Sequence, residues 1–267
     1  MPDIKLICLD VDGTLVADDH TSIPDLNKKA LAEAMRRGIH IALVSGRLST
    51  SLHPIQKKAG ITGPLGCFSG ALVVDEYDKI LDSHPITEEQ ALTVIDLARS
   101  CDVTTFLFGQ RHWYKERQDY FATLEEEIAS AGIMTEDFDS LIKTGNQPWY
   151  KVLCMSTEEQ VISSTKARFQ EVFGDELNIY LSSPRYLELS VKGIDKGNAV
   201  DVLLSHYKFQ RSQCMAIGDF YNDIGMFHGA GLSVAMGNAP EAVKREADIV
   251  TATNVEGGLG KAIMSIL

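Results

Sequence analysis

Cysteine is scarce in the chain, and no two of its five cysteines form a C-x-x-C pair. The sequence therefore argues against a structural zinc site and against a redox dithiol. The five are odd in number, widely spaced and mostly in apolar runs: Cys8, Cys67, Cys101, Cys154 and Cys214. We expect buried, reduced thiols in a cytoplasmic protein.

Basic residues and long apolar runs are also in short supply. The 267 residues include 25 Lys and Arg against 37 Asp and Glu, a formal net charge of −12. Binding to nucleic acid or to anionic membranes depends on excess Lys and Arg, so we expect neither partner. No apolar run approaches the ~20 residues that span a bilayer. The run at residues 6–9 ends in Asp10, which is not a secretory pattern.

Several ligand-binding motifs are missing. The sequence has no G-x-x-x-x-G-K-[ST] loop, and its seven histidines show no H-E-x-x-H spacing. The Gly-Ala-Gly at 229–231 precedes a predicted strand and lacks a third glycine, so it is not a dinucleotide-binding loop. An EF-hand starting at Asp10 is excluded, because Leu15 and Thr21 occupy its glycine and glutamate positions.

Short apolar runs alternate with segments of helical period, first at the N-terminal end of the chain. Residues 4–9 and 39–44 predict buried strands, and 25–37 predict a helix with Pro24 at its start and Gly38 at its end. The same rhythm resumes after residue 195. Helices are predicted at 196–207, from 222 and at 241–246, and strands at 213–217, 232–235 and 248–250. This alternation predicts an α/β fold whose parallel sheet is covered on both faces.

The order of predicted strands and helices differs in the middle of the chain. A hairpin is predicted at 71–75 and 79–82, and from about residue 85 helices and short strands follow in α+β order. A helix is predicted at 120–131, and a polar stretch without a predicted helix or strand follows at 135–148. We therefore predict a core domain of residues 1–84 and 191–267, and an inserted α+β domain of residues 85–190.

Polar side chains follow the predicted strands of the core. Asp10-Val11-Asp12-Gly13-Thr14 follows the first strand, Ser45-Gly46-Arg47 the second, and Gly218-Asp219 with Asn222-Asp223 the strand after the insert. Lys196 opens the helix between them. Because ligands of parallel sheets bind at the carboxyl ends of strands, we expect these groups to meet at one edge.

Each signal also has a simpler interpretation. A lone D-x-D is usually a solvated turn, Lys196 could lie on an exposed helix face, and Asp223 could merely stabilise the first turn of a helix. Taken together, however, four carboxylates at one edge repel one another. A hard divalent cation relieves that repulsion, and oxygen ligands point to Mg²⁺. Such a site suits phosphoryl transfer, in which Asp is a known nucleophile.

These four motifs, in this order, resemble those of the haloacid dehalogenase (HAD) superfamily. The place of the insert resembles the type IIB cap of Cof-like phosphatases, and residues 233–241 with Asn254 resemble the end of that family. The resemblance covers essentially the whole chain. It implies a Rossmann-like parallel-sheet core with an inserted cap, and a Mg²⁺-dependent phosphatase of small phosphorylated metabolites such as sugar phosphates.

The resemblance also implies roles for individual residues. Asp10 would be the nucleophile, and Asp12 the general acid and then the general base, with a pKa raised by neighbouring carboxylates and partial burial. The residues that would hold Mg²⁺ are Asp10, Asp219, Asp12 through its backbone carbonyl, and Asp223, which would orient metal-bound water or Lys196. The residues that would bind the phosphoryl group are Ser45, Gly46, Lys196 and Asn222.

Two positions depart from the family pattern: Ser69 and Phe220 stand where relatives commonly have Asn. The insert would act as a lid that sets specificity. Its candidate residues are Arg111, His112, Trp113, Tyr114, Lys115, Arg185 and Tyr186. A phosphomutase or phosphotransferase, and a non-enzymatic phospho-acceptor module, remain alternatives.

Overall fold

The computed structural model describes residues 3–19, 21–129 and 133–267. The chain divides into two compact units: unit 1 is Met1–Ser83 with Ile194–Leu267, and unit 2 is His84–Gly193. The sequence pattern places these divisions after residues 84 and 190. Val191, which that prediction assigns to the core, ends a strand of unit 2 and pairs there with Leu177.

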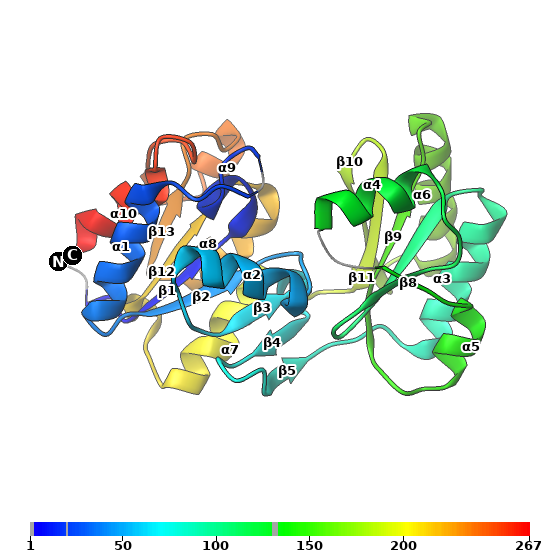
Figure 1. Ribbon diagram of the computed structural model, residues 1–267, viewed down its shortest axis with the longest axis horizontal. Helices are drawn as coiled ribbons and strands as arrows, with labels where there is room; N and C mark the ends of the chain where they lie inside the picture. The colour runs from blue at the N-terminus through cyan, green and yellow to red at the C-terminus, as the bar shows by residue number, and fades with distance from the viewer. Residues whose placement is uncertain (1–2, 20, 130–132) are drawn as a thin grey trace. The chain divides into compact units, whose positions relative to one another are not determined.

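Unit 1 is built on an eight-stranded sheet of order β14-β13-β12-β1-β2-β3-β4-β5 (Figure 1). The strands are β1 (Leu6–Leu9), β2 (His40–Val44), β3 (Leu65–Cys67), β4 (Leu72–Val74), β5 (Ile80–Ser83), β12 (Cys214–Gly218), β13 (Leu232–Ala235) and β14 (Ile249–Val250). Pairing from β14 through β3 is parallel, and β3, β4 and β5 pair antiparallel. The predicted α/β fold with a parallel sheet is therefore confirmed, as is the predicted hairpin.

Helices cover both faces of this sheet. They are α1 (Asp25–Arg36), α2 (Ser49–Ala59), α7 (Lys196–Tyr207), α8 (Ile224–Gly229), α9 (Glu241–Lys244) and α10 (Gly258–Ile266). Leu6 and Cys8 of β1 pack in one cluster with Leu203 of α7. Ile7 and Leu9 alternate with them and point to the other face, and all four are fully buried. A strand buried on both faces reads as a continuous apolar run, which is why the sequence revealed it.

Hydrogen bonds join the two points where the chain leaves and re-enters unit 1. The chain leaves after β5 and returns at Ile194, shortly before α7. The Asn198 side chain of α7 donates to the Asp82 carboxylate of β5 and to the Gly70 carbonyl, both at 2.9 Å. The parts of unit 1 on either side of the insertion are thus hydrogen-bonded to each other.

Unit 2 contains a six-stranded, mostly antiparallel sheet of order β10-β11-β9-β6-β7-β8. Its strands are β6 (Thr104–Gly109), β7 (Trp113–Lys115), β8 (Met134–Thr135), β9 (Trp149–Met155), β10 (Leu177–Ser183) and β11 (Tyr186–Val191). Its helices are α3 (Glu88–Ser100), α4 (Tyr120–Ala129), α5 (Phe138–Lys143) and α6 (Glu159–Phe173). The predicted helix at 120–131 corresponds to α4, and its predicted last two residues lie outside the described ones.

Helix α5 lies inside the stretch at 135–148 for which no helix was predicted. It has only six residues, of which Phe138 and Ile142 are buried. Asp137 caps it by accepting from the Ser140 backbone N–H at 2.9 Å. Its apolar side chains, Phe138, Leu141 and Ile142, span a single helical turn in a polar segment, which is too short a repeat to predict a helix. Packing against α3 supplies the stability that so short a helix lacks.

Several side chains proposed as specificity residues lie inside unit 2 instead. Trp113, Tyr114 and Lys115 of β7 are at most 5% exposed. The Lys115 ammonium pairs with the Glu126 carboxylate of α4. These three residues belong to the interior of the unit, whereas Arg111, His112 and Arg185 are exposed and Tyr186 is half-buried.

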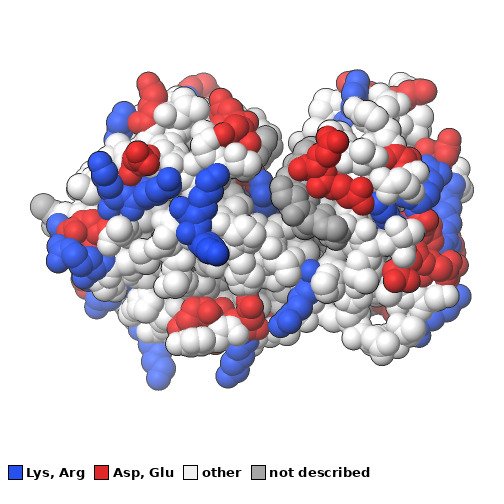
Figure 2. Space-filling model, viewed as in Figure 1, with Lys and Arg blue, Asp and Glu red and all other residues white. Residues whose placement is uncertain are grey.

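The surface carries both signs of charge. On the face drawn in Figure 2, basic and acidic side chains are interspersed rather than gathered into one basic stripe. A continuous basic stripe is the usual mark of a nucleic-acid-binding surface, and this face does not present one. Among the described residues, none of the helices combines the length and the apolar character needed to cross a membrane.

Candidate active site

Asp10 lies directly beyond the carboxyl end of β1. Its backbone N–H donates to the Ile217 carbonyl at 2.9 Å, which extends the β1–β12 pairing by one residue. The side chain is only 8% exposed. The next residues turn sharply at Gly13, whose φ of +79° is a left-handed conformation that suits glycine. The carboxylate is thus held at the strand end that the sequence pattern predicted.

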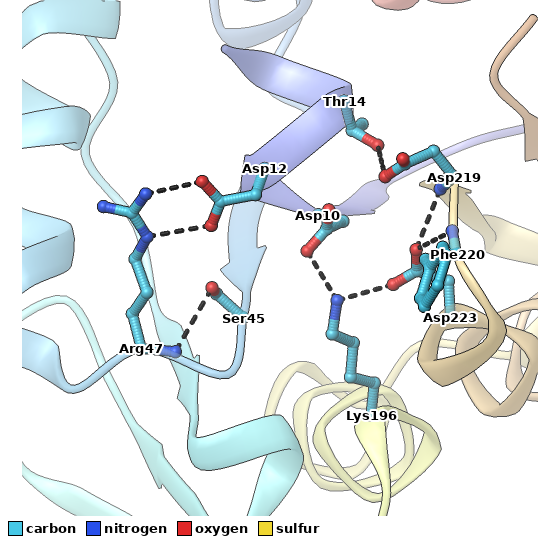
Figure 3. Close-up of polar contacts among 9 residues, drawn as sticks. All are labelled: Asp10, Asp12, Thr14, Ser45, Arg47, Lys196, Asp219, Phe220 and Asp223. Atoms are coloured by element: carbon cyan, nitrogen blue, oxygen red, sulfur yellow. Dashed lines mark hydrogen bonds and ion pairs between the residues drawn. The ribbon is translucent and has the colours of Figure 1, made fainter. Parts of the chain in front are cut away.

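Lys196 is the first residue of α7 and is 1% exposed. Its ammonium donates to an oxygen of Asp10 at 2.5 Å and to one of Asp223 at 2.6 Å (Figure 3). Burial alone would lower the pKa of Lys196, but the charges of Asp10 and Asp223 outweigh burial and raise that pKa. The interpretation of Lys196 as a solvated surface lysine is therefore wrong.

Asp219 and Asp223 follow β12. The second oxygen of Asp223 accepts from the backbone N–H groups of Asp219 and Phe220, at 2.8 and 2.9 Å. Asp223 therefore stabilises its own loop as well as contacting Lys196. Asp219 accepts from the hydroxyl of Thr14 at 3.1 Å, which links the β12 loop to the β1 loop.

Negative charge is in excess at this point. One carboxylate oxygen each from Asp10, Asp219 and Asp223 lies within 4.8 Å of the others, and the Lys196 ammonium contacts two of these three carboxylates. Burial raises the pKa of Asp10 well above its usual range; Lys196 opposes this shift, and Asp223 and Asp219 add to it. Burial, followed by repulsion from Asp223, raises the pKa of Asp219 to about 6. The all-oxygen donor set and the uncompensated charge fit a hard divalent cation.

Asp12 does not join this cluster. Its two oxygens accept from the guanidinium of Arg47 at 2.8 and 2.5 Å, and Figure 3 shows the side chain directed toward that residue. The side chain thus points across to the β2 loop, and the expectation that neighbouring carboxylates and partial burial raise its pKa stays a prediction. Its backbone carbonyl as a metal ligand stays a prediction.

The residues predicted to bind phosphate are distributed around the same strand ends. Ser45 is buried, and its hydroxyl accepts from the Arg47 backbone N–H at 3.3 Å. Gly46 follows it, and a Cβ there would lie 3.6 Å from the Ser69 hydroxyl, so the loop leaves room at this backbone position. Asn222 is exposed in the short helical turn Tyr221–Asp223. Their contacts with phosphate stay predictions.

Three residues of the site received no role from the sequence. Thr14 and Arg47 stood inside the quoted motifs; Thr14 contacts the predicted metal ligand Asp219, and Arg47 contacts the predicted general acid Asp12. Asn238 follows the carboxyl end of β13 and donates to Asp219 at 3.2 Å. The rule of looking at the carboxyl ends of parallel strands would have found Asn238 had it been applied to β13 as well.

The chain is similar to known proteins over nearly its whole length. The family model of the haloacid dehalogenase-like hydrolases matches residues 7–263. The chain belongs to this family. Over 263 residues it is 30% identical to the 5-amino-6-(5-phospho-D-ribitylamino)uracil phosphatase YcsE of Bacillus subtilis, a match that covers 98% of this chain and 95% of the relative. It is 27% identical to the HMP-PP phosphatase of Yersinia enterocolitica, over 91% of this chain and 87% of that protein.

The solved structures agree. A haloacid dehalogenase-like hydrolase from Bacteroides thetaiotaomicron has a TM-score of 0.91 and 28% identity to the chain, covering 99% of this chain and 100% of that one. These matches confirm the resemblance to haloacid dehalogenase phosphatases of the Cof type. The protein is an enzyme, a phosphatase of this family, so the alternative of a non-enzymatic phospho-acceptor module is wrong.

Proposed function

We propose that this haloacid dehalogenase-like phosphatase hydrolyses small phosphorylated metabolites, sugar phosphates among them, with Mg²⁺ as cofactor and an aspartyl-phosphate on Asp10. One observation carries the proposal: Asp10 contacts Lys196 and lies within 4.8 Å of ligand oxygens of Asp219 and Asp223. A carboxylate beside an ammonium and a cation site is the arrangement that phosphoryl transfer requires. The Bacillus subtilis relative, named as a phosphatase of a phosphorylated ribityl compound, supports the substrate class.

The reaction would proceed in two steps. An oxygen of Asp10 attacks phosphorus, and the bond from phosphorus to the ester oxygen breaks while Asp12 gives its proton to the leaving alcohol. Asp12 then takes a proton from water, whose oxygen attacks the phosphoryl group and releases phosphate from Asp10. Since Asp12 is charge-paired with Arg47 in this structure, its use as an acid requires release from that guanidinium.

The remaining residues would bind and neutralise the transferring group. Lys196, the Ser45 hydroxyl, the Gly46 N–H and Asn222 would hold phosphoryl oxygens. Mg²⁺ would be held by the residues predicted from the sequence: Asp10, Asp219, Asp223 and the Asp12 carbonyl. When bound, the cation would offset the negative charge that gathers on the phosphoryl oxygens.

We further propose that unit 2 acts as a lid that excludes water and supplies contacts to the leaving group. Its support is its place in the chain, inserted between the loop of Ser45 and the helix of Lys196. Among the candidate specificity residues, Arg111, His112 and Arg185 are exposed, which is compatible with such contacts.

Activity measurements test the proposal directly. We expect the enzyme to release inorganic phosphate from p-nitrophenyl phosphate and from a panel of sugar phosphates with Mg²⁺ present, and to lose that activity in EDTA. Nucleoside monophosphates in the same panel test the substrate class. Transfer of phosphate to an added sugar in preference to water would favour the phosphotransferase alternative, and full activity in EDTA would refute the metal.

The raised pKa values predict how Mg²⁺ stabilises the protein. Burial penalises the ionised form of Asp219, so its pKa rises from about 4 in the unfolded chain to about 6 in the folded protein. Without metal, the contribution of Asp219 to stability is therefore greatest below about pH 4 and is lost as the pH rises through about 6. Protons compete with the cation at low pH. Differential scanning fluorimetry should therefore show a larger Mg²⁺-induced rise in Tm at about pH 7.5 than at about pH 5. Equal shifts at both pH values would contradict this.

A further inference from the structure

Asn238 lies in the loop after β13, and although it is exposed, its carboxamide bridges three segments of unit 1. Its NH₂ donates to the Gly13 carbonyl at 2.9 Å and to an oxygen of Asp219 at 3.2 Å. Its own oxygen accepts from the Asn254 backbone N–H at 3.0 Å. Both N–H donors of the side chain are therefore committed to the loops that carry the proposed catalytic groups.

These contacts hold the Asp219 carboxylate in a fixed orientation. One of its oxygens accepts from the Thr14 hydroxyl and the other from Asn238. Both donors are neutral, whereas the hydrogen bonds of Lys196 go to Asp10 and Asp223. The donors therefore fix the direction of the Asp219 carboxylate without cancelling its charge.

The packing leaves that carboxylate little freedom. A Cβ on Gly13 would come within 2.3 Å of the Asp219 oxygen that faces Asn238, so the turn of the β1 loop lies directly against it. On the other side, Asn254 is 2% exposed, and its NH₂ donates to the Val16 carbonyl at 3.1 Å. Asn238 is thus anchored to a residue that is itself bonded to the segment following Asp10.

We propose that Asn238 is a positioning residue for the divalent cation. It acts through Asp219, holding one carboxylate oxygen in place while tying the β12 loop to the β1 loop. The inference rests on the proposed metal site. Carboxylates that ligate metals are themselves held by hydrogen bonds, and loss of such a partner weakens metal affinity by about 10-fold or more.

Binding of Mn²⁺ alone tests this without reference to turnover. The free-ion signal in electron paramagnetic resonance gives the Kd for Mn²⁺ of the wild type and of Asn238→Ala. We expect Asn238→Ala to raise the Kd about 10-fold, while its Tm in EDTA stays near that of the wild type because the residue is exposed. Asn178→Ala is the matched control: it removes an amide that donates to the Val191 carbonyl in unit 2, and should leave the Kd unchanged.

A second variant separates loss of the contact to Asp219 from misfolding of Asn238→Ala. Asn238→Ser keeps a small polar group that is too short to reach Asp219, and we expect it to raise the Kd as well. A Kd within twofold of the wild type in both variants would overturn the proposal that Asn238 positions Asp219 for the cation. This holds even if Tm falls, because Asn238 would then only hold the loops of unit 1 together. No Mn²⁺ binding by the wild type would instead refute the metal site itself.

Discussion

Replacing Asp10 with asparagine is expected to abolish turnover, lowering kcat by about 10⁴-fold or more. The amide has the shape of the carboxylate but is not a nucleophile towards phosphorus, so no acyl-phosphate forms. The measurement is phosphate release from p-nitrophenyl phosphate at saturating Mg²⁺. Because Lys196 keeps its bond to Asp223, the variant should remain folded.

The matched control is Asp201→Asn, the same change on the exposed side of α7. It should leave kcat within about twofold of the wild type, as expected for a surface change remote from the site. If Asp10→Asn keeps more than about a tenth of the wild-type kcat, Asp10 is not the nucleophile.

Replacing Lys196 with methionine is expected to cost about 3–5 kcal/mol of stability in the metal-free protein, because it leaves buried carboxylates without a cation. Asp223 and Asp10 are both buried, so water cannot replace the ammonium. At about 2–4 °C per kcal/mol, Tm should fall by roughly 6–20 °C. The fall should be smaller at low pH, where the raised pKa of Asp10 allows that group to be neutral.

Lys244→Met provides the comparison. Lys244 forms an ion pair with Glu241 one turn away at 2.9 Å, and Glu241 is 78% exposed. Exposed pairs of this kind are screened by solvent and contribute little to stability, so Tm should hardly change. A Lys196→Met variant that melts within a degree or two of Lys244→Met would show that the Asp10–Lys196–Asp223 group contributes no more than a surface pair.

The parallel core was predictable because burial on both faces leaves a mark on the sequence. Strand β1 is a continuous apolar run, β2 is one after its first residue, His40, and helix α1 between them has one apolar face. Helix α5 left no comparable mark, since its three apolar side chains span only one helical turn. Likewise, nothing in the sequence of β7 distinguishes a buried Lys115 from an exposed one; its partner Glu126 lies in a separate helix.

The candidate site also has a part that the sequence could predict and a part that it could not. Topology alone brings the ends of β1 and β12 together, so the proximity of Asp10 to Asp219 follows from where the strands end. The direction of a side chain does not follow. Asp12 could have turned to the carboxylates or to Arg47, 35 residues away, and only the packed structure shows the choice. Asn238 lay in the segment 233–241, which was matched to the family but received no role in the site.

The bond from Asn198 to Asp82 has an evolutionary consequence. It joins the exit and return points of the chain on unit 1, so the ends of any segment inserted there start close together. Adjacent ends are the condition under which a fold tolerates insertion of a foreign module. Descendants could therefore exchange or enlarge the inserted module to suit new substrates while inheriting the same hydrolytic machinery.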